Sequence, residues 1–403
     1  MTVSRPALLF LCQTLPYPPD GGVTIRTFNV LKLLAAKYDV YAICFYRKST
    51  ARDVPSSLEA LRPYTSSIDV FPIDQEKSTL RLLRDHALSI LTQRVYTRFA
   101  YDSAGVHARL RALLEERTYA LVHADSLDLS GYFPMLGDTP IVCVHHNVES
   151  LLLKRRADAE PHLLRRLYLS LQARLMRSEE RVWCPQVALN VVCSPDDRTV
   201  LQSLVPNVNV AIVPNGVDIE EFQPGSNDGT GVVFVGGMTW FPNKDALEYF
   251  TDSILPELER SGPLPRVLWV GRALEGAREY YGGRGVQLTG YVDDVKPYVH
   301  DAHCFVVPLR VGGGTRLKIL AAWGMGKAVV STSIGCEGLD VRDGWNILIR
   351  DDAAGFAAAI RELLSDAALR ERLGANARTT VVEAYGWERI GEDMLATYKR
   401  VVT

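Results

Sequence analysis

The chain has 403 residues, of which 47% are hydrophobic and 23% are charged, and its formal net charge is -2. One hydrophobic core does not extend over this length, so we expect two domains of about 150 to 200 residues each. The near-neutral charge excludes nucleic acid as a general partner, and any basic site must be local.

Cysteine usage and hydropathy indicate a compartment. Seven cysteines are scattered without CxxC spacing, and most fall in apolar runs such as LLFLCQ and IVCVHH, which predicts reduced thiols in buried strands. The sequence has neither a charged-then-apolar leader nor an apolar run of about eighteen residues. We therefore expect a cytoplasmic protein with no membrane-spanning segment.

Short apolar runs alternate with segments of helical periodicity, which predicts parallel sheets covered by helices. In the first half of the chain, strands are expected at 7–12, 40–45, 68–73, 119–124, 140–146, 187–194 and 210–214. After a stretch rich in Pro, Gly, Asn and Asp, further strands are expected at 232–237, 266–271, 285–290, 304–309, 328–333 and 346–349.

These elements predict an α/β protein of two doubly wound, Rossmann-like domains that face a central cleft. Ligands are expected in that cleft, at the carboxyl ends of the strands. The first domain is expected at 1–212, the linker at 213–231 and the second domain at 232–385. The amphipathic end of the chain, 386–403, is expected to cross back and pack on the first domain.

The segment VGGGTRLKILAAWGMGK (311–327) follows a predicted strand and contains three consecutive glycines. It predicts a flexible turn, Thr315 as the N-cap, a helix from Arg316 to Met325, and Gly326 as the helix stop.

Two cations are expected in the first turn of this helix, where the helix dipole disfavours positive charge. They are Arg316 and Lys318, and the chain has no Asp or Glu between Asp301 and Glu337. A bound phosphate or diphosphate would compensate them, because glycine amides and a helix amino end hold anions, and Arg310 would help to close around it. The alternative is a tight strand-to-helix turn with solvated cations.

Other phosphate motifs do not fit the spelling of the chain. AAWGMGKA lacks the first glycine and the hydroxyl residue of a P-loop, and CQTLPYPPDGG after the first strand is not GxGxxG.

A second candidate loop, TLPYPPDGGVTIRTFN, follows the first predicted strand. Gly21 and Gly22 permit close backbone approach to a ligand, and Arg26 repeats the cation near a helix start. The alternative is an ordinary strand-to-helix connection.

A third candidate is VCVHHNVES, where a buried strand ends in His145 and His146. A histidine at this position can hydrogen-bond a substrate or donate a proton, although a structural role is an equal alternative. His123 and Asp125 end the neighbouring apolar run, so we expect these side chains to converge on one rim.

Two acidic pairs, Asp293 with Asp294 and Asp351 with Asp352, are interpreted as helix starts rather than metal ligands. We expect no metal.

Several blocks of the sequence resemble a known family. LPYPPDGGVTIR, HHNVES, VPNGVD, FVGGMTWFPNKDAL, LTGYVDDVKPYV and PLRVGGGTRLKILAAWGMGKAVVSTSIGCEGL resemble the nucleotide-sugar-dependent glycosyltransferases of family 4, which have the GT-B fold. The resemblance covers nearly the whole chain, and its last block is the most specific. The first block and HHNVES resemble bacterial sugar transferases associated with exopolysaccharide gene clusters.

The resemblance implies a retaining transfer from a nucleoside diphosphate sugar to a glycan, lipid-linked or natural-product acceptor, without a metal. Arg316 and Lys318 would stabilise the leaving diphosphate, and either His145 or His146 would contact the donor sugar. The residues expected to bind the nucleotide sugar are Gly21, Gly22, Arg26, Gly237, Lys244, Arg310, Gly313, Gly314, Thr315 and Ala321.

The sequence departs from the family pattern at two positions eight residues apart, where the family carries glutamates. Gly313 replaces the first, as it does in relatives with the GGGTR loop, and Ala321 replaces the second, which binds ribose hydroxyls. Ala321 is compatible with an engineered substitution, a compensated divergence or a protein that no longer catalyses. The rival functions are a non-catalytic nucleotide-binding subunit, which Ala321 supports, and a GT-B sugar-nucleotide epimerase.

One further segment, Leu151 to Trp183, carries eight Lys or Arg against four Asp or Glu, with leucines at helical spacing. Peripheral contact with an anionic membrane is one interpretation. The other is a helical connection over the first domain, with its leucines facing the core.

Overall fold

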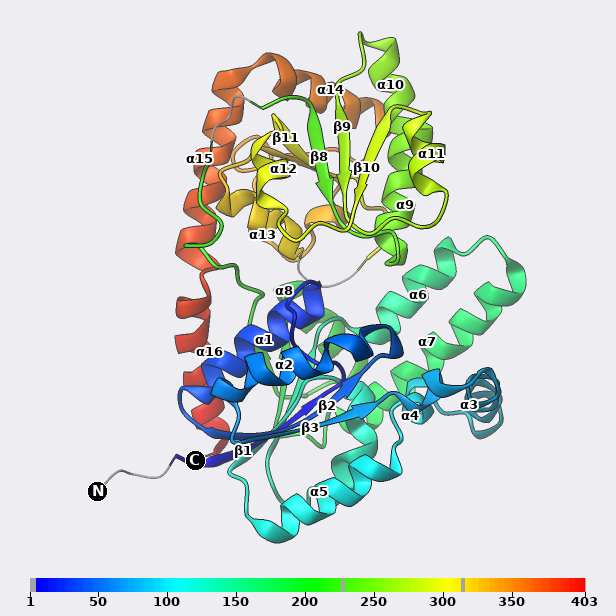
Figure 1. Ribbon diagram of the computed structural model, residues 1–403, viewed down its shortest axis with the longest axis vertical. Helices are drawn as coiled ribbons and strands as arrows, with labels where there is room; N and C mark the ends of the chain where they lie inside the picture. The colour runs from blue at the N-terminus through cyan, green and yellow to red at the C-terminus, as the bar shows by residue number, and fades with distance from the viewer. Residues whose placement is uncertain (1–4, 226–228, 313–315, 403) are drawn as a thin grey trace. The chain divides into compact units, whose positions relative to one another are not determined.

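The computed structural model describes residues 5–225, 229–312 and 316–402, and the chain divides into two compact units (Figure 1). Unit 1 comprises Met1–Pro214 and Gly391–Thr403, and unit 2 comprises Asn215–Ile390. The segment predicted as a linker, 213–231, is thus split between the units after Pro214.

The sheet of unit 1 is parallel, with strand order β3-β2-β1-β4-β5-β6-β7. Every strand expected from the sequence in this half of the chain is present. The order reverses beside β1, where Leu8 pairs with Val40 of β2 on one side and with Leu121 of β4 on the other. The strands are β1 (Ala7–Cys12), β2 (Asp39–Tyr46), β3 (Ser67–Pro72), β4 (Leu121–Ala124), β5 (Ile141–His145), β6 (Leu189–Val192) and β7 (Val210–Ile212).

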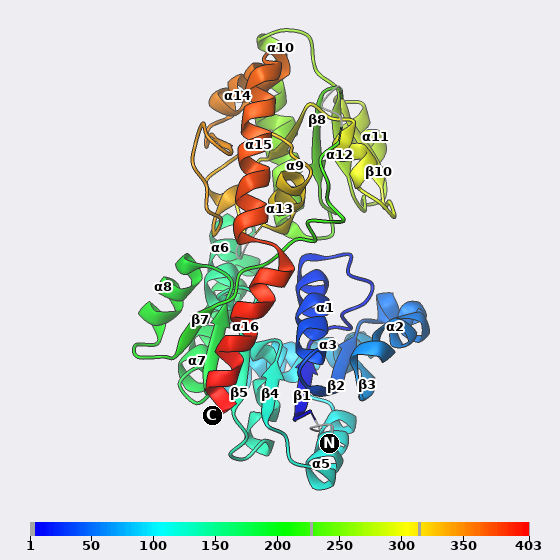
Figure 2. The same ribbon diagram turned by 90° about the vertical axis from the view of Figure 1, so that its left-hand side faces the viewer.

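Helices cover both faces of this sheet. Alternate residues such as Leu9 and Leu11 of β1 enter a core shared with α5 and α7, while α1 and α16 cross the other face (Figure 2). The end of the chain packs on this unit, with the backbone of Gly391 against Leu33. The helices are α1 (Gly22–Ala35), α2 (Val54–Leu61), α3 (Thr79–Thr92), α4 (Thr97–Ala100), α5 (Ala104–Glu116), α6 (Glu149–Ala159), α7 (Leu163–Trp183), α8 (Pro195–Leu204) and α16 (Trp387–Val402).

Unit 2 repeats this arrangement with strand order β10-β9-β8-β11-β12-β13, again parallel, so its order reverses between β8 and β11. The strands are β8 (Val232–Val235), β9 (Val267–Val270), β10 (Val286–Gly290), β11 (Cys304–Val307), β12 (Val329–Ser331) and β13 (Leu348–Ile349). The helices are α9 (Phe241–Tyr249), α10 (Leu255–Arg260), α11 (Ala277–Gly282), α12 (Lys296–His300), α13 (Leu317–Gly324), α14 (Ala353–Ser365) and α15 (Ala367–Ala384).

The helix predicted after the glycine-rich turn is α13, and its start differs from the prediction. The helix begins at Leu317 and Arg316 occupies the N-cap position that was predicted for Thr315. Thr315, Gly313 and Gly314 lie outside the described residues. The predicted stop is confirmed, since Gly326 adopts a left-handed φ of 67° just beyond the helix.

The basic segment 151–183 forms most of α6 and all of α7. Leu175 faces the core, as the second interpretation predicted, but Leu163, Leu164 and Leu167 are exposed, so that interpretation is wrong for the first half of α7. The seven cysteines are buried, and none of them is in a disulfide. Among the described residues, no helix is both long and apolar enough to cross a membrane.

Gly374 in α15 provides a test of the packing in unit 2. A Cβ at this position would lie 2.0 Å from the carbonyl oxygen of Gly326, whereas a Cβ at Gly282 in α11 would meet nothing within 4 Å. We expect Gly374→Ala to lower the melting temperature by about 5 °C, because overpacking costs about 1–3 kcal/mol. Gly282→Ala is the matched control and should leave the melting temperature unchanged. Equal melting temperatures of the two variants in circular dichroism would contradict this packing.

Candidate functional site

Lys318 and Asn243 meet at the point where the strand order of unit 2 reverses. Lys318 follows β11 and its Nζ donates to Oδ1 of Asn243, which follows β8, at 2.7 Å. The same Nζ lies 3.9 Å from the ring centroid of Phe234 in β8. Asn243 is itself fixed, because its Nδ2 donates to the carbonyl of Gly237 at 3.0 Å. Open α/β sheets bind ligands at such a reversal.

The ammonium group of Lys318 is incompletely compensated. Burial, together with the nearby Arg316, lowers the pKa of the Lys318 amine well below its usual value. Within the described residues no carboxylate lies at ion-pair distance from its Nζ, and the first turn of α13 has no acidic residue. An anion at this position would restore the charged form.

The guanidinium group of Arg316 has a hydrogen-bond acceptor and a carboxylate partner within unit 2. Its Nε and Nη2 donate to the carbonyl of Ile334 at 3.3 and 3.0 Å, and Nη2 lies 3.8 Å from Oε2 of Glu337. The expectation that the chain supplies no negative charge near this turn was therefore wrong. Glu337 lies far from the turn in the sequence, but the connection after β12 places it close to Arg316.

Arg310 and Lys244 also have carboxylate partners. Asp245 accepts two hydrogen bonds from Arg310, at 2.7 Å from Nη2 and 3.2 Å from Nε. Lys244 lies one helical turn from Glu248, with 3.5 Å between Nζ and Oε1. Arg310 is thus paired with Asp245 of α9, and its expected part in closing around a phosphate stays a prediction.

Ala321 lies one turn after Lys318 on α13, so the two residues share a face of the helix. Ala321 is half-buried, whereas its neighbours Leu320 and Ala322 are fully buried in the core. A glutamate at position 321, as in the family pattern, would therefore place its carboxylate on the side of α13 that carries Lys318.

The strand reversal of unit 1 is bridged by Asp125. Thr27 in α1 donates from Oγ1 to Oδ2 of Asp125 at 2.7 Å, joining the segment after β1 to the segment after β4. His146, after β5, donates from Nε2 to the same oxygen at 3.2 Å, and His123 Nε2 lies 3.6 Å from Oδ1. Burial alone would raise the pKa of Asp125, but His146 and His123 hold it well below its ordinary value.

The two adjacent histidines have different surroundings. His145 is buried and its Nε2 donates to Oδ1 of Asn190 at 2.9 Å, so its ring faces the interior of unit 1. Of the two histidines, one of which is expected to contact the donor sugar, His145 thus lies in the interior, and the sugar contact itself stays a prediction. His146 has the Nε2 proton on the Asp125 side, which leaves its Nδ1 as a hydrogen-bond acceptor.

The second candidate segment contains a buried arginine. Arg26 is buried, and its Nη2 and Nη1 donate to the carbonyls of Val213 and Pro214 at 2.8 and 3.1 Å. These carbonyls follow β7, so the Arg26 guanidinium lies in the interior of unit 1, and its expected contact with the nucleotide sugar stays a prediction. Gly21 is the N-cap of α1 and Gly22 its first residue.

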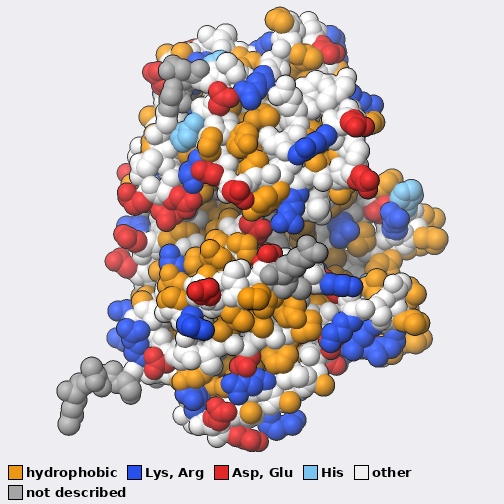
Figure 3. Space-filling model, in the orientation of Figure 1, with side chains coloured by type: hydrophobic (Ala, Val, Ile, Leu, Met, Phe, Trp, Pro, Cys, Tyr) orange, Lys and Arg blue, Asp and Glu red, His pale blue; other side chains and the backbone are white. Residues whose placement is uncertain are grey.

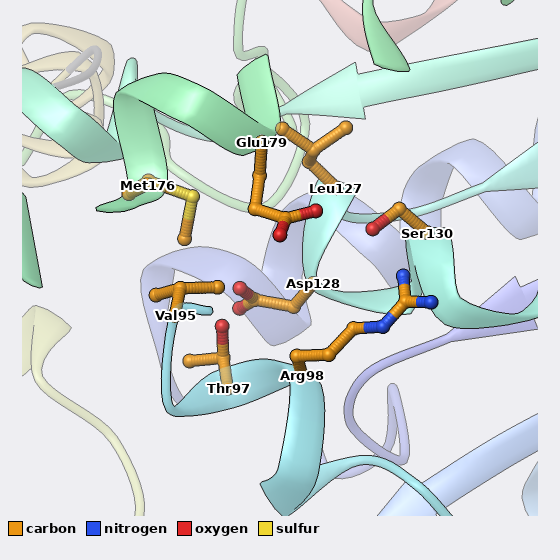
Figure 4. Close-up of a pocket in the computed structure, with 8 residues that line it drawn as sticks. All are labelled: Val95, Thr97, Arg98, Leu127, Asp128, Ser130, Met176 and Glu179. Carbon is orange, nitrogen blue, oxygen red and sulfur yellow. The ribbon is translucent and has the colours of Figure 1, made fainter. Parts of the chain in front are cut away.

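Unit 1 also contains a cavity that the sequence did not indicate. Its volume is about 190 Å³, and it is lined by Arg98, Phe99, Tyr101, Asp102, His107, Asp128, Gly131 and Tyr132. Figure 4 shows the adjoining pocket, in which Asp128 lies between Thr97 and Arg98 on α4 and Glu179 on α7. Burial raises the pKa of the Asp128 carboxyl.

One aspartate of each acidic pair lies at a helix start, whereas Asp351 accepts from the Ser333 amide at 2.8 Å. Asp294 accepts from the Lys296 amide at 2.9 Å, and Asp352 caps α14 through the Gly355 amide at 2.8 Å. Within the described ranges, no three His, Cys, Asp or Glu side chains are arranged to hold a metal ion.

Sequence reasoning missed Asn243 and Thr27, the two neutral residues that bridge the strand reversals. Asn243 lies in the quoted block WFPNKD, immediately before Lys244. A polar residue in the helix that follows the first strand of a doubly wound domain was the available signal.

The buried His145 predicts a pH dependence of stability. Burial lowers its pKa from 6.5 to about 4, so the unfolded state binds more protons between these pH values. The stability that neutral His145 contributes above pH 6.5 should be lost as the pH falls towards 4, by about 3 kcal/mol. We expect the melting temperature of His145→Gln to fall less between pH 7 and pH 4 than that of the unmodified protein. His162→Gln, at an exposed histidine, should behave like the unmodified protein; parallel curves for all three would contradict the assignment.

Comparisons with known proteins agree with this architecture. The profile of the family described as Glycosyltransferase Family 4 matches residues 20–221, half of the chain, and that of Glycosyl transferases group 1 matches residues 229–366. The chain is 35% identical over 115 residues to the lipopolysaccharide core biosynthesis glycosyltransferase LpsE of Rhizobium meliloti, covering 27% of this chain and 33% of LpsE. The chain spans 33% to 56% of the lengths of the four curated relatives that it matches.

Two solved structures show the fold over nearly the whole length. Sucrose-phosphate synthase from Thermosynechococcus elongatus superposes with a TM-score of 0.72 at 18% identity, covering 98% of this chain and 99% of that one. Anabaena HepE, in complex with UDP and glucose, superposes with a TM-score of 0.68 at 15% identity, covering 98% and 100%. With two parallel Rossmann-like sheets and half of its length matched by the family profile, the chain belongs to glycosyltransferase family 4 and has the GT-B fold.

Proposed function

We propose that the protein is a retaining glycosyltransferase that moves a sugar from a nucleoside diphosphate sugar to a glycan, lipid-linked or natural-product acceptor in the cytoplasm. The observation that carries the proposal is the Lys318 ammonium at the strand reversal of unit 2, held by Asn243 without a carboxylate partner among the described residues. A diphosphate supplies the negative charge that this position lacks.

The departing diphosphate gains charge on the oxygen that bridged it to the sugar. Lys318 and the amino end of α13 stabilise that charge, and Arg316 supports the turn through Ile334 and Glu337. This proposal needs no metal. UDP is the first nucleotide to test, because HepE, which shares the fold, was solved with UDP and glucose.

We assign the sugar-handling role in unit 1 to His146. Its Nε2 is fixed on Asp125, which orients the ring and makes Nδ1 the nitrogen that would accept from a sugar hydroxyl, and 7% of the side chain is exposed. His145 is assigned a structural role with Asn190.

The nucleotide site can be tested by thermal shift with UDP, GDP, ADP and TDP on this chain and on Ala321→Glu. A ligand at about 100 times its Kd adds about 2.7 kcal/mol and raises the melting temperature by a few degrees. We expect one nucleotide to stabilise both forms and to bind Ala321→Glu at least tenfold more tightly, because a carboxylate beside Lys318 accepts from ribose hydroxyls. No response of either form to any nucleotide would contradict the site.

The role of Lys318 can be tested by turnover. With the sugar nucleotide identified by the thermal shifts, Lys318→Met should release nucleoside diphosphate about 100-fold more slowly, a loss typical of removing one transition-state donor. Lys296→Met, whose amine pairs with Glu221 and Asp294, is the matched control and should retain full activity. Binding without turnover would favour the non-catalytic subunit, for which Ala321 is the specific support. A free isomer formed from donor alone would identify an epimerase.

A further inference from the structure

Helix α3 (Thr79–Thr92) turns its apolar face to solvent. Leu80, Leu83 and Leu91 are 81%, 61% and 78% exposed, and with Ile90 they form one stripe at spacings of three, seven and eight residues. A helix on a water-soluble surface normally buries such a stripe. The apolar face of α3 therefore has an unusual environment.

The opposite face of α3 is polar and buried, so the orientation of the helix is fixed. Asp85 accepts from Arg84 Nη2 at 2.9 Å, and Ser89 accepts from Gln172 Nε2 of α7 at 2.9 Å. His86 hydrogen-bonds to Tyr168 of α7. A rotation that buried the leucines would break the hydrogen bonds with Gln172 and Tyr168 of α7, and it would carry Asp85 away from Gln75, whose Nε2 donates to its Oδ2 at 3.4 Å.

The first half of α7 extends the same kind of surface. Tyr168, which contacts α3, is preceded by exposed Leu163, Leu164 and Leu167. Figure 3 shows hydrophobic and Lys or Arg side chains next to one another on the side of unit 1 that carries α3 and α7.

The charge around these leucines is basic. No Asp or Glu occurs between Glu160 and Glu179, a stretch that contains Arg165, Arg166, Arg174 and Arg177. Both Arg165 and Arg166 are exposed in the turn that carries the leucines. Exposed leucines beside exposed arginines match the boundary between acyl chains and anionic headgroups, because the leucines partition among the acyl chains and the arginines pair with the headgroups.

We propose that the apolar stripe of α3, together with the leucines at the start of α7, docks unit 1 on a lipid bilayer that contains anionic headgroups. The leucines enter the acyl boundary and Arg165 and Arg166 contact the headgroups. This surface is separate from the nucleotide site, and the proposal does not rest on the proposed reaction.

The test is co-sedimentation of the full chain with vesicles of phosphatidylcholine alone and of phosphatidylcholine mixed with phosphatidylglycerol. We expect binding to the mixed vesicles that weakens at high salt. Leu83→Gln combined with Leu91→Gln should lower the partition constant at least tenfold, with glutamine chosen because it retains helix propensity. Leu264→Gln combined with Leu274→Gln, at exposed leucines of unit 2, is the matched control and should bind like the unmodified protein.

Three results would overturn the proposal. The first is that the unmodified chain does not bind mixed vesicles, and the second is that the α3 double variant binds them as tightly as the unmodified chain does. The third is a dimer, detected by light scattering, that the α3 variant abolishes; the stripe would then be an interface between copies of the chain. The melting temperature of each variant checks that α3 remains folded. Nucleotide thermal shifts should be unchanged in the α3 variant, so failure of this proposal is distinguishable from failure of the proposed function.

Discussion

The reversal of strand order beside the first strand of each sheet is the constraint on which the candidate residues of each unit depend. At this point consecutive connections leave the sheet in opposite directions, so the segments after the two central strands separate and leave polar groups between them. Each unit bridges the reversal with a side-chain hydrogen bond. Unit 1 uses Thr27 and Asp125, and unit 2 uses Asn243 and Lys318.

The two bridges differ in how their charge is balanced. The buried Asp125 is surrounded by His123 and His146, which stabilise the carboxylate and are oriented by it. Lys318 has a neutral amide and an aromatic ring as partners, and its amine has a lowered pKa. A cation taken out of water in this way costs free energy that a neutral partner only partly offsets. A ligand of opposite charge is the simplest compensation, whereas Asp125 already has its compensation inside the protein.

Polar contacts also determine which face of α3 meets solvent. Facing inward, Ser89 accepts a hydrogen bond from Gln172 of α7, and Asp85 accepts one from Gln75, which precedes α3. Turning this face outward would break both hydrogen bonds, at about 0.5–1.5 kcal/mol each, which opposes the gain from burying the leucines. The apolar surface is therefore a consequence of the polar contacts beneath it.

The sequence by itself determined the strands, the two doubly wound sheets and the family, because these follow from local periodicity and from contiguous motifs. It also indicated the helix after the glycine-rich turn and its stop at Gly326. Partners could not be predicted, since they come from segments far apart in the chain. Only the tertiary structure paired Arg310 with Asp245, and Arg26 with the carbonyl of Val213.

The distinction between His145 and His146 has the same physical origin. Successive residues at the end of a strand point to opposite sides, and the neighbouring strand decides what each meets. Asn190 of β6 receives the first and Asp125 after β4 receives the second. A local motif reveals which residue types are present, but strand order decides which of them have a partner inside the protein and which are left for a ligand.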